Sequence, residues 1–282
     1  MTTLLETLRS EEPFVAAELR PPRAELASAA GMDAWIDTYH AVRSLTLKKT
    51  AVFLTDSAVG VPEEDNLRHL TANIGHDAAR DLIVPILTSK HPLEYCLSYA
   101  DRARQNGFGS LVVLGGDRRI GIPRSVEHAW ELRRAIRATG SDLVLGGWAN
   151  PYRAAERQID YLSDPQFCGE YFLTQIVSHH DVDPVARFLE RAEARGMTMP
   201  GIFGVFYYRS ATPRTLALLA DFIAVPVEGL TREYAGGAPP EEVCARTVRA
   251  LMALGVRRFY ISNLPLVGTT RTLARIRDLA GI

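Results

Sequence analysis

The chain has few cysteines, no long apolar run and no excess charge of either sign. Its 282 residues include three cysteines, Cys96, Cys168 and Cys244, and none belongs to a Cys-x-x-Cys pair. An odd number of isolated cysteines argues against a disulfide framework. No segment reaches the roughly 18 apolar residues of a membrane-spanning helix, and the first twelve residues hold no signal-peptide core. We therefore expect a soluble, cytoplasmic protein with no membrane partner.

The charge balance excludes a broad electrostatic attraction to polyanions. Lys and Arg number 32 and Asp and Glu number 33, which gives a formal net charge of −1. Nucleic-acid-binding domains usually carry a basic surplus, so no nucleic-acid partner is expected. Anionic ligands must then be held by local charge. The sequence does not indicate an oligomeric state.

Several familiar motifs are also missing. No Gly-x-Gly-x-x-Gly follows an apolar run, because Gly107 and Gly109 precede one, and neither a P-loop nor Gly-x-Ser-x-Gly occurs. A separate Rossmann unit is therefore not expected. The segment His179-His180-Asp181 suggests a metal, but adjacent side chains rarely reach one ion together and no third ligand is evident. We predict no metal site.

What the chain does contain is a series of short apolar runs separated by stretches with helical spacing. Most of the runs recur roughly every 30 residues, the length of one strand, loop, helix and return. They are apolar throughout, as parallel strands buried on both faces are. The predicted strands are Phe14–Glu18, Ala51–Thr55, Leu82–Leu87, Leu111–Leu114, Leu143–Trp148, Tyr171–Ile176, Gly201–Phe206 and Phe259–Ser262.

Apolar residues at three- and four-residue spacing predict helices between these strands. Examples are the set Trp35, Ile36, Tyr39 and Val42 and the set Val126, Ala129, Leu132 and Ile136. The last unit is longer, with a helix near 213–222, a second helix from Glu241, and an apolar piece, Ile223–Val227, that can be mistaken for a strand. Alternating strands and helices over this length predict an α/β fold, a single (β/α)8 TIM barrel spanning residues 1–282 with a short N-terminal helical extension.

Glu18 stands where the first predicted strand ends against Pro21 and Pro22. Each proline fixes φ and lacks an N–H donor, so the strand cannot continue through them. The carboxyl ends of the strands of a parallel barrel share one face, where catalytic groups lie. Glu18 is therefore a candidate for chemistry, and the alternative is that it pairs with Arg20 or Arg23 and only stabilises the strand end.

Polar or aromatic side chains lie at the ends of the other predicted strands as well. An acid, an amide, hydroxyls and aromatic rings at one mouth suit a flat, nitrogen-rich heterocycle, which exposes paired donors and acceptors and a face for stacking. Taken singly, each has a structural explanation, such as helix capping by Thr55 or packing by Tyr208. The residues are Thr55, Thr88, Asp117, Trp148, Asn150, Gln175, Tyr207, Tyr208 and Asn263.

The order of these residues resembles the methylenetetrahydrofolate reductase family, over most of the chain from about Phe14 to the last strand. No single motif carries the resemblance, but the ordered set is fairly specific. It consists of Glu18 with Pro21-Pro22-Arg23, Thr55, Gly116-Asp117, Thr174-Gln175 and Pro200-Gly201-Ile202.

The resemblance implies a barrel enzyme that reduces 5,10-methylenetetrahydrofolate to 5-methyltetrahydrofolate. Glu18 would be the general acid that protonates a ring nitrogen, so that the five-membered ring opens to an iminium and hydride reduces the methylene carbon. Asp117 and Gln175 would hold the pterin edge, and Asp117 would favour the cationic intermediate. Thr55 and Tyr208 are further candidates for contact with the folate.

Three departures from the family fall where a flavin would bind. The third strand ends in Pro85-Ile86-Leu87-Thr88 where members have a histidine, and Gly115 replaces an arginine before Gly-Asp. The segment 162–168 holds Asp164 and no cation where members have a basic, phosphate-binding stretch. The chain is therefore similar to the flavin-independent branch, in which NADH or NADPH passes hydride directly to the folate.

The nicotinamide dinucleotide would then bind at the same mouth. Trp148 and Tyr207 would line its ring pocket, and Arg118, Arg119 or Arg153 would meet its phosphates. For these arginines, a solvated surface position is the alternative.

Other functions stay open from the sequence. The first is an FAD-dependent reductase in which other arginines hold the phosphates of the FAD. The second is a non-catalytic folate-binding barrel subunit, and the third is a pterin-binding methyltransferase barrel. The presence of Glu18 disfavours the non-catalytic subunit, because binding alone needs no acid at that position.

Overall fold

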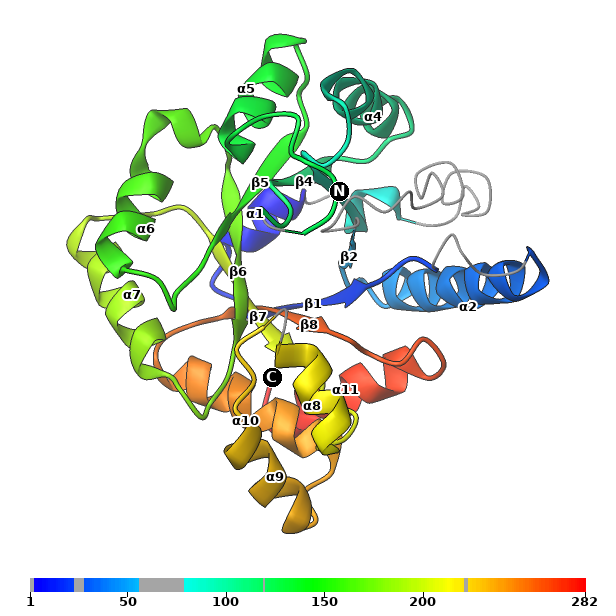
Figure 1. The fold of residues 1–282 in the computed structure, drawn as a ribbon, viewed down its shortest axis with the longest axis vertical. Helices are drawn as coiled ribbons and strands as arrows, with labels where there is room; N and C mark the ends of the chain where they lie inside the picture. The colour runs from blue at the N-terminus through cyan, green and yellow to red at the C-terminus, as the bar shows by residue number, and fades with distance from the viewer. Residues whose placement is uncertain (1–2, 23–27, 56–78, 119, 221–222) are drawn as a thin grey trace.

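The computed structural model describes residues 3–22, 28–55, 79–118, 120–220 and 223–282 and contains a closed barrel of eight parallel strands (Figure 1). The strands follow one another around the barrel in chain order, and β1 pairs with β8 to close it. The strands are β1 (Phe14–Leu19), β2 (Val52–Leu54), β3 (Ile83–Thr88), β4 (Ser110–Leu114), β5 (Val144–Ala149), β6 (Tyr171–Val177), β7 (Gly201–Phe206) and β8 (Arg258–Ser262). Arg23 and Arg119 lie outside the described residues.

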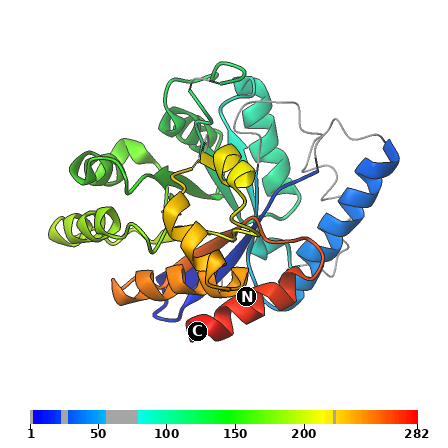
Figure 2. The same ribbon diagram turned by 60° about the horizontal axis from the view of Figure 1, so that its bottom comes forward.

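Helices surround the strands, as the turned view in Figure 2 shows. Within the described ranges, no helix is both long enough and apolar enough to span a bilayer. The helices are α1 (Leu4–Arg9), α2 (Ser28–Leu47), α4 (Leu93–Gln105), α5 (Ala129–Ala138), α6 (Ala155–Ser163), α7 (Asp183–Ala194), α8 (Pro213–Ala220), α9 (Val227–Ala235), α10 (Pro240–Ala253) and α11 (Thr269–Ala280), with 3-10 turns at Arg80–Leu82 and Pro165–Phe167.

The predicted TIM barrel is confirmed, and each predicted strand overlaps an observed one. The apolar piece Ile223–Val227 is not a strand. Val227 instead begins α9, a helix that the sequence analysis missed, after Pro226, whose missing N–H disfavours strand pairing. The helix expected to include Val126 begins only at Ala129, because the preceding loop is bonded to the loop after β3 through Ser125 N and Ser89 O, 2.6 Å apart.

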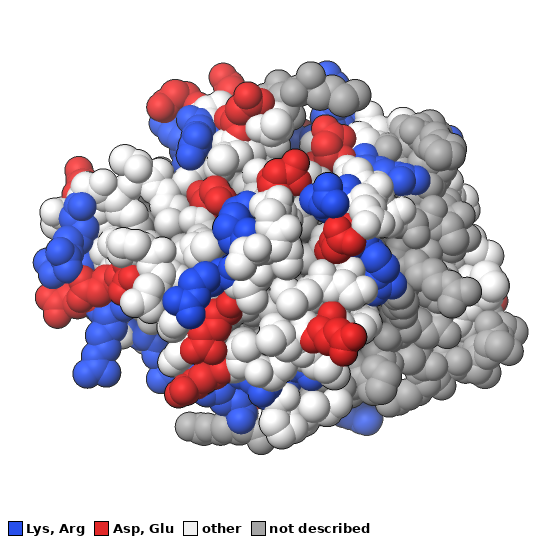
Figure 3. Space-filling model, turned by 90° about the horizontal axis from the view of Figure 1, so that it is seen from above, with Lys and Arg blue, Asp and Glu red and all other residues white. Residues whose placement is uncertain are grey.

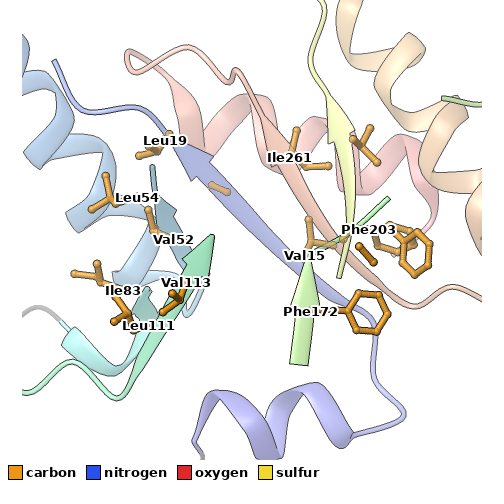
Figure 4. Packing of buried hydrophobic residues seen from close by; sticks show 14 of the residues in the cluster. Val15, Leu19, Val52, Leu54, Ile83, Leu111, Val113, Phe172, Phe203 and Ile261 are labelled. Carbon is orange, nitrogen blue, oxygen red and sulfur yellow. The ribbon is translucent and has the colours of Figure 1, made fainter. Parts of the chain in front are cut away.

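The outward-facing side chains of the strands form the main apolar core against the helices. Figure 4 shows members of this layer from several strands, including Val15, Leu54, Val113 and Ile261. Not every predicted core position belongs to it, because Ile36 of α2 is 46% exposed. Since the outer face is covered by helices and the inner face by other strands, both faces are apolar, which explains the uniform hydrophobicity of the strand sequences.

Helix α1 closes the N-terminal end of the barrel. Leu4 and Leu8 are buried in the same cluster as the inward-facing Phe14 and Ala16. A capping box fixes the start of the helix, in which Thr3 N donates to Glu6 Oε2 at 2.7 Å and Thr3 Oγ1 accepts from Glu6 N at 3.3 Å. With this end filled, ligands have access from the carboxyl ends of the strands.

Two tyrosines fill the interior of the barrel beside glycines on neighbouring strands. Tyr171 of β6 is paired in register with Gly146 of β5, and Tyr260 of β8 with Gly204 of β7. The Tyr171 hydroxyl lies 2.8 Å from Ser110 Oγ, and the Tyr260 hydroxyl donates to Thr174 O at 2.6 Å. Each glycine leaves the space that the adjacent ring occupies, so the barrel is a packed core and not a pore.

Replacing Gly146 by alanine should destabilise the protein by about 1–3 kcal/mol through overpacking. An added Cβ would lie 2.6 Å from Tyr171 Cζ, and the ring is fully buried and hydrogen-bonded, so it cannot swing away. Urea denaturation measures the loss. Gly109→Ala is the matched control, because nothing lies within 4 Å of a Cβ at that position. Equal stability of the two variants would contradict this packing.

Candidate active site

Glu18 lies at the carboxyl-end mouth, where the closure of the barrel sets it beside the last residue of β8. Ala17 pairs with Ile261, so Glu18 and Ser262 are the next residues along the two strands. Ser262 Oγ donates to Glu18 Oε1 at 2.5 Å. Among the described residues Glu18 has no salt bridge, so the alternative in which it only pairs with Arg20 is not what the structure shows.

The Glu18 carboxyl faces a cavity of about 410 Å³ that contains few charges. Its wall combines this acid with hydroxyls, an amide, two arginines and apolar side chains from β7, β8, α8 and the loops after β1 and β8. The lining residues are Glu18, Leu19, Arg20, Thr55, Phe206, Arg209, Leu219, Ile223, Ser262, Asn263, Leu264 and Leu266. A half-apolar cavity with convergent polar groups is the usual form of a small-molecule site.

Burial raises the pKa of the Glu18 carboxyl above its ordinary value, and the hydrogen bond from Ser262 opposes this shift only in part. The inward-facing Tyr260 lies behind it in the barrel, and burial together with the nearby Glu18 charge raises the pKa of its phenol as well. A carboxyl with a raised pKa keeps its proton to higher pH than an ordinary carboxyl and can donate it there. Glu18 is therefore the candidate general acid.

The loops after β7 and β8 are held together beside this cavity. Asn263 has a positive φ of 66°, and its Nδ2 donates to Tyr207 O at 3.0 Å. Arg209 donates to the carbonyls of Asn263 and Leu264, at 3.2 and 3.0 Å through Nη2. Arg209 thus both lines the cavity and fixes its rim. Arg20 is exposed at the same cavity and is a candidate for contact with an anionic group.

Of the predicted substrate-binding residues, only Thr55 shares this cavity with Glu18. Asp117 follows β4 at the same face of the barrel, and its Oδ1 accepts from Ile120 N at 2.9 Å, which closes the loop after Gly116. Gln175 Oε1 accepts from Ile176 N at 3.0 Å at a register shift between β6 and β7. Such a bulge redirects a side chain at a strand end.

Tyr208 has a feature expected of a ligand-facing residue. Its side chain is buried against Phe206, at 4.8 Å between ring centroids, and packs with Leu216 and Leu230. Its hydroxyl is buried and has no hydrogen-bond partner in the described part of the chain. A buried polar atom without a partner is costly, and a ligand that reaches it would remove this cost.

The predicted nicotinamide-binding residues are not gathered at one place. The Tyr207 hydroxyl donates to Glu241 Oε1 at 2.9 Å on α10, and the side chain belongs to the apolar layer outside the barrel. Trp148 is half-buried and packs against the interior cluster. Arg118, with Nη2 3.4 Å from His128 Nδ1, and Arg153 are both exposed. Trp148, Arg118 and Arg153 remain available at the mouth, whereas Tyr207 is committed elsewhere.

The residues where a flavin would bind fit it poorly. Ile86 is buried inside the barrel and offers no donor. In the segment 162–168, Asp164 Oδ1 accepts from Gln166 N at 2.8 Å, and Arg133, which contacts the segment from α5, donates to Phe167 O at 2.7 Å, to Val113 O at 3.0 Å and to the Tyr161 hydroxyl at 3.1 Å. The Arg133 guanidinium is fully buried, so it cannot meet a phosphate.

The arginine missing at position 115 is replaced in space by another arginine, Arg124. The guanidinium of Arg124 packs over Gly115, where an added Cβ would lie 2.6 Å from Arg124 Cζ, and Arg124 Nη2 donates to Gly116 O. The loop before α5 thus supplies a cation beside Gly115 from nine positions further along the chain. Elsewhere the charge is mixed, and the face in Figure 3 shows Lys and Arg interspersed with Asp and Glu.

Sequence reasoning missed three residues at or near the candidate site: Ser262, Arg209 and Arg124. Ser262 was predicted only as the end of a strand. A closed barrel with β8 beside β1 gives the signal that would have found it, since the last inward-facing residue of β8 must lie next to that of β1.

Comparison with known proteins supports the fold. No protein-family model matches the chain, and no curated protein matches its sequence. Among solved structures, it is similar to a Clostridium thermocellum protein that binds two copies of 5-methyl-5,6,7,8-tetrahydrofolic acid, with 17% identity, 97% of each chain covered and a TM-score of 0.68.

Two enzymes are also similar in structure. An F420-dependent secondary alcohol dehydrogenase has 11% identity and a TM-score of 0.56, over 95% of this chain and 99% of that one. Dihydrodipicolinate synthase from Agrobacterium tumefaciens has 14% identity and a TM-score of 0.57, over 97% of this chain and 77% of that one. At these identities the likeness shows a shared TIM-barrel fold.

The pH dependence of stability tests the state of Glu18. Because its folded-state pKa is raised above the ordinary value of 4.5, folding is favoured while the carboxyl is protonated, and this advantage is lost as pH rises from 4.5 through the folded-state pKa. The slope for one group is at most about 1.4 kcal/mol per pH unit. Relative to wild type, Glu18→Gln should therefore gain stability across this window, as measured by urea denaturation at several pH values. A difference that stays constant with pH would show an ordinary carboxyl.

Proposed function

We propose that this protein binds a reduced folate at the carboxyl-end mouth of its barrel and reduces 5,10-methylenetetrahydrofolate to 5-methyltetrahydrofolate with NADH or NADPH as hydride donor. The observation that carries the proposal is Glu18, a half-buried carboxyl with a raised pKa that faces a cavity of about 410 Å³. Support comes from the ordered strand-end residues that resemble methylenetetrahydrofolate reductases and from the folate-binding protein of similar fold.

The proposed chemistry needs one proton and one hydride. Glu18 donates the proton to a ring nitrogen of the substrate, the bond from that nitrogen to the methylene carbon breaks, and an iminium forms at the other nitrogen. Hydride from the reduced nicotinamide adds to the methylene carbon and gives the methyl product and the oxidised nicotinamide. Solvent then returns the proton to Glu18. Ser262 holds the carboxyl in place through its 2.5 Å hydrogen bond to Oε1.

The remaining strand-end residues have binding roles in this proposal. Asp117 and Gln175 hold the donor and acceptor edge of the pterin, while Thr55, just after β2, and Tyr208, just after β7, contact the folate. Arg20 is suited to an anionic part of the ligand, since it is exposed at the cavity. Trp148, Arg118 and Arg153 are the proposed contacts of the nicotinamide dinucleotide. Tyr207 is left out because its hydroxyl is bound to Glu241.

Glu18→Gln should lower turnover by roughly a hundred- to ten-thousand-fold, the range of a lost general acid, while folate affinity changes little. The amide keeps the shape of the side chain but has no proton to transfer. Nicotinamide oxidation with and without methylenetetrahydrofolate measures turnover, and equilibrium titration measures affinity. Glu156→Gln on α6 is the matched control, because that carboxylate is 73% exposed. If Glu18→Gln binds folate and turns over like wild type, the acid is elsewhere.

Asp117→Asn should weaken folate binding as well as slow the reaction. An amide in place of the carboxylate changes the contacts to the pterin edge themselves, and a mismatched buried polar contact costs about 1–3 kcal/mol, or roughly 5- to 150-fold in affinity. The same two measurements apply. Unchanged affinity in Asp117→Asn would remove Asp117 from the folate site without affecting the proposed role of Glu18.

We further expect the purified protein to be colourless and to gain little activity from added FAD. One reason is that the buried Ile86 offers no hydrogen-bond donor. The other is that Arg133, which contacts the segment 162–168, already donates its hydrogen bonds to protein oxygens. The visible spectrum after gel filtration decides this. A yellow preparation with near-stoichiometric flavin would support an FAD-dependent reductase. Folate binding without nicotinamide oxidation would instead indicate a non-catalytic folate-binding subunit.

A further inference from the structure

A second cluster of polar side chains, from the loop after β6 and from α9, shares no residue with the Glu18 cavity. His179 and His180 belong to the loop between β6 and α7, and Glu233 lies on α9, more than fifty residues further along the chain. One ligand atom from each of the three lies within 4.8 Å of the others. The sequence argument against a metal was that two adjacent histidines lack a third ligand, and α9 supplies it.

The two imidazoles point at one carboxylate. His179 Nε2 lies 3.1 Å from Glu233 Oε1, and His180 Nε2 lies 3.1 Å from Glu233 Oε2. Their ring centroids are 4.0 Å apart at an interplanar angle of 37°, so both nitrogens face the same space. A tetrahedral ion about 2.0–2.1 Å from each ligand atom sets those atoms roughly 3.3 Å apart. The two nitrogen–oxygen distances of 3.1 Å are close to this value, and the three ligand atoms, which lie within 4.8 Å of one another, would draw together around an ion.

The surroundings of the cluster fit metal ligation. His179 Nδ1 lies 2.7 Å from Thr247 Oγ1 on α10, and a bond in which the imidazole donates to Thr247 leaves the Nε2 lone pair for a metal. Gly229 of α9 makes room for His180, because a Cβ there would lie 2.5 Å from His180 Nδ1. Each imidazole is thus placed by a contact on its far side.

Arg246 also forms an ion pair with the Glu233 carboxylate. Arg246 Nη1 donates to Glu233 Oε1 at 2.7 Å, but Arg246 Nε also donates to Glu242 Oε1 at 3.1 Å. Glu242 is held by Arg249 as well, at 2.8 Å, so the role of Arg246 here is to orient Glu233. A cavity of about 640 Å³ lined by His180, Glu233, Arg246 and the Gly236-Gly237 turn adjoins the cluster. It leaves room for water or a small ligand at a fourth coordination position.

We propose that His179, His180 and Glu233 form a binding site for one divalent transition-metal ion of the zinc type, with Thr247 as the residue that orients His179. Two imidazoles and one carboxylate with an open fourth position are the donor set of such ions, whereas Mg²⁺ and Ca²⁺ prefer oxygen ligands only. The proposal does not depend on the folate chemistry, because the cluster shares no residue with the Glu18 cavity.

Metal titration of the untagged, chelator-treated and dialysed chain tests the site. Calorimetry with Zn²⁺ should show one equivalent per chain, and Co²⁺ should give the intense visible absorption of a tetrahedral site. His179→Ala and His180→Ala should each abolish stoichiometric binding. Thr247→Val, which keeps the side-chain shape but not the hydroxyl, should lower affinity by about 10- to 100-fold. His40→Ala, on the exposed face of α2, is the matched control and should bind as wild type.

Two results would overturn the proposal. One is less than a tenth of an equivalent of either ion bound by the wild-type chain, a measurement that needs no variant to fold. The other is wild-type affinity in His179→Ala and His180→Ala variants whose circular dichroism matches the parent. The cluster would then be a hydrogen-bonded tie between the β6–α7 loop and α9.

Discussion

The mouth of this barrel depends on the parallel pairing of the first strand with the last. That pairing brings Glu18 and Ser262, which are 244 positions apart, to a 2.5 Å hydrogen bond. At an open sheet edge Glu18 would be solvated and its pKa would stay near the ordinary value. Closure surrounds the carboxyl with β1, β8 and the packed interior, and this burial raises its pKa.

The packing of the interior directs ligands to one end of the barrel. The rings of Tyr171 and Tyr260 fill the middle beside Gly146 and Gly204, and α1 covers the N-terminal end with Leu4 and Leu8. In the part of the chain that the structure describes, a ligand therefore has access from the carboxyl ends of the strands, where the polar residues lie. The same packing keeps the strands rigid, which holds Glu18 in a fixed position relative to the cavity.

Local hydrogen bonds decide which strand-end residues remain available there. Tyr207 follows the same strand as Tyr208, but its hydroxyl is used by Glu241 on the outer side, while the hydroxyl of Tyr208 is buried without a partner among the described residues. Gln175 turns at the irregularity between β6 and β7. Position at a strand end therefore does not by itself secure a place in the site.

The sequence by itself determined the strands, their parallel arrangement and the location of Glu18 at a strand end, because apolar runs, helical spacing and prolines act within a few residues of one another. It did not determine the partners of these residues. Ser262 beside Glu18, Arg124 over Gly115, and Glu233 facing His179 and His180 all join segments that lie far apart in the chain or on different elements. Only tertiary structure decided these contacts, since the first requires the barrel to close, the second requires the loop after β4 to fold back on itself, and the third requires α9 to pack against the loop after β6.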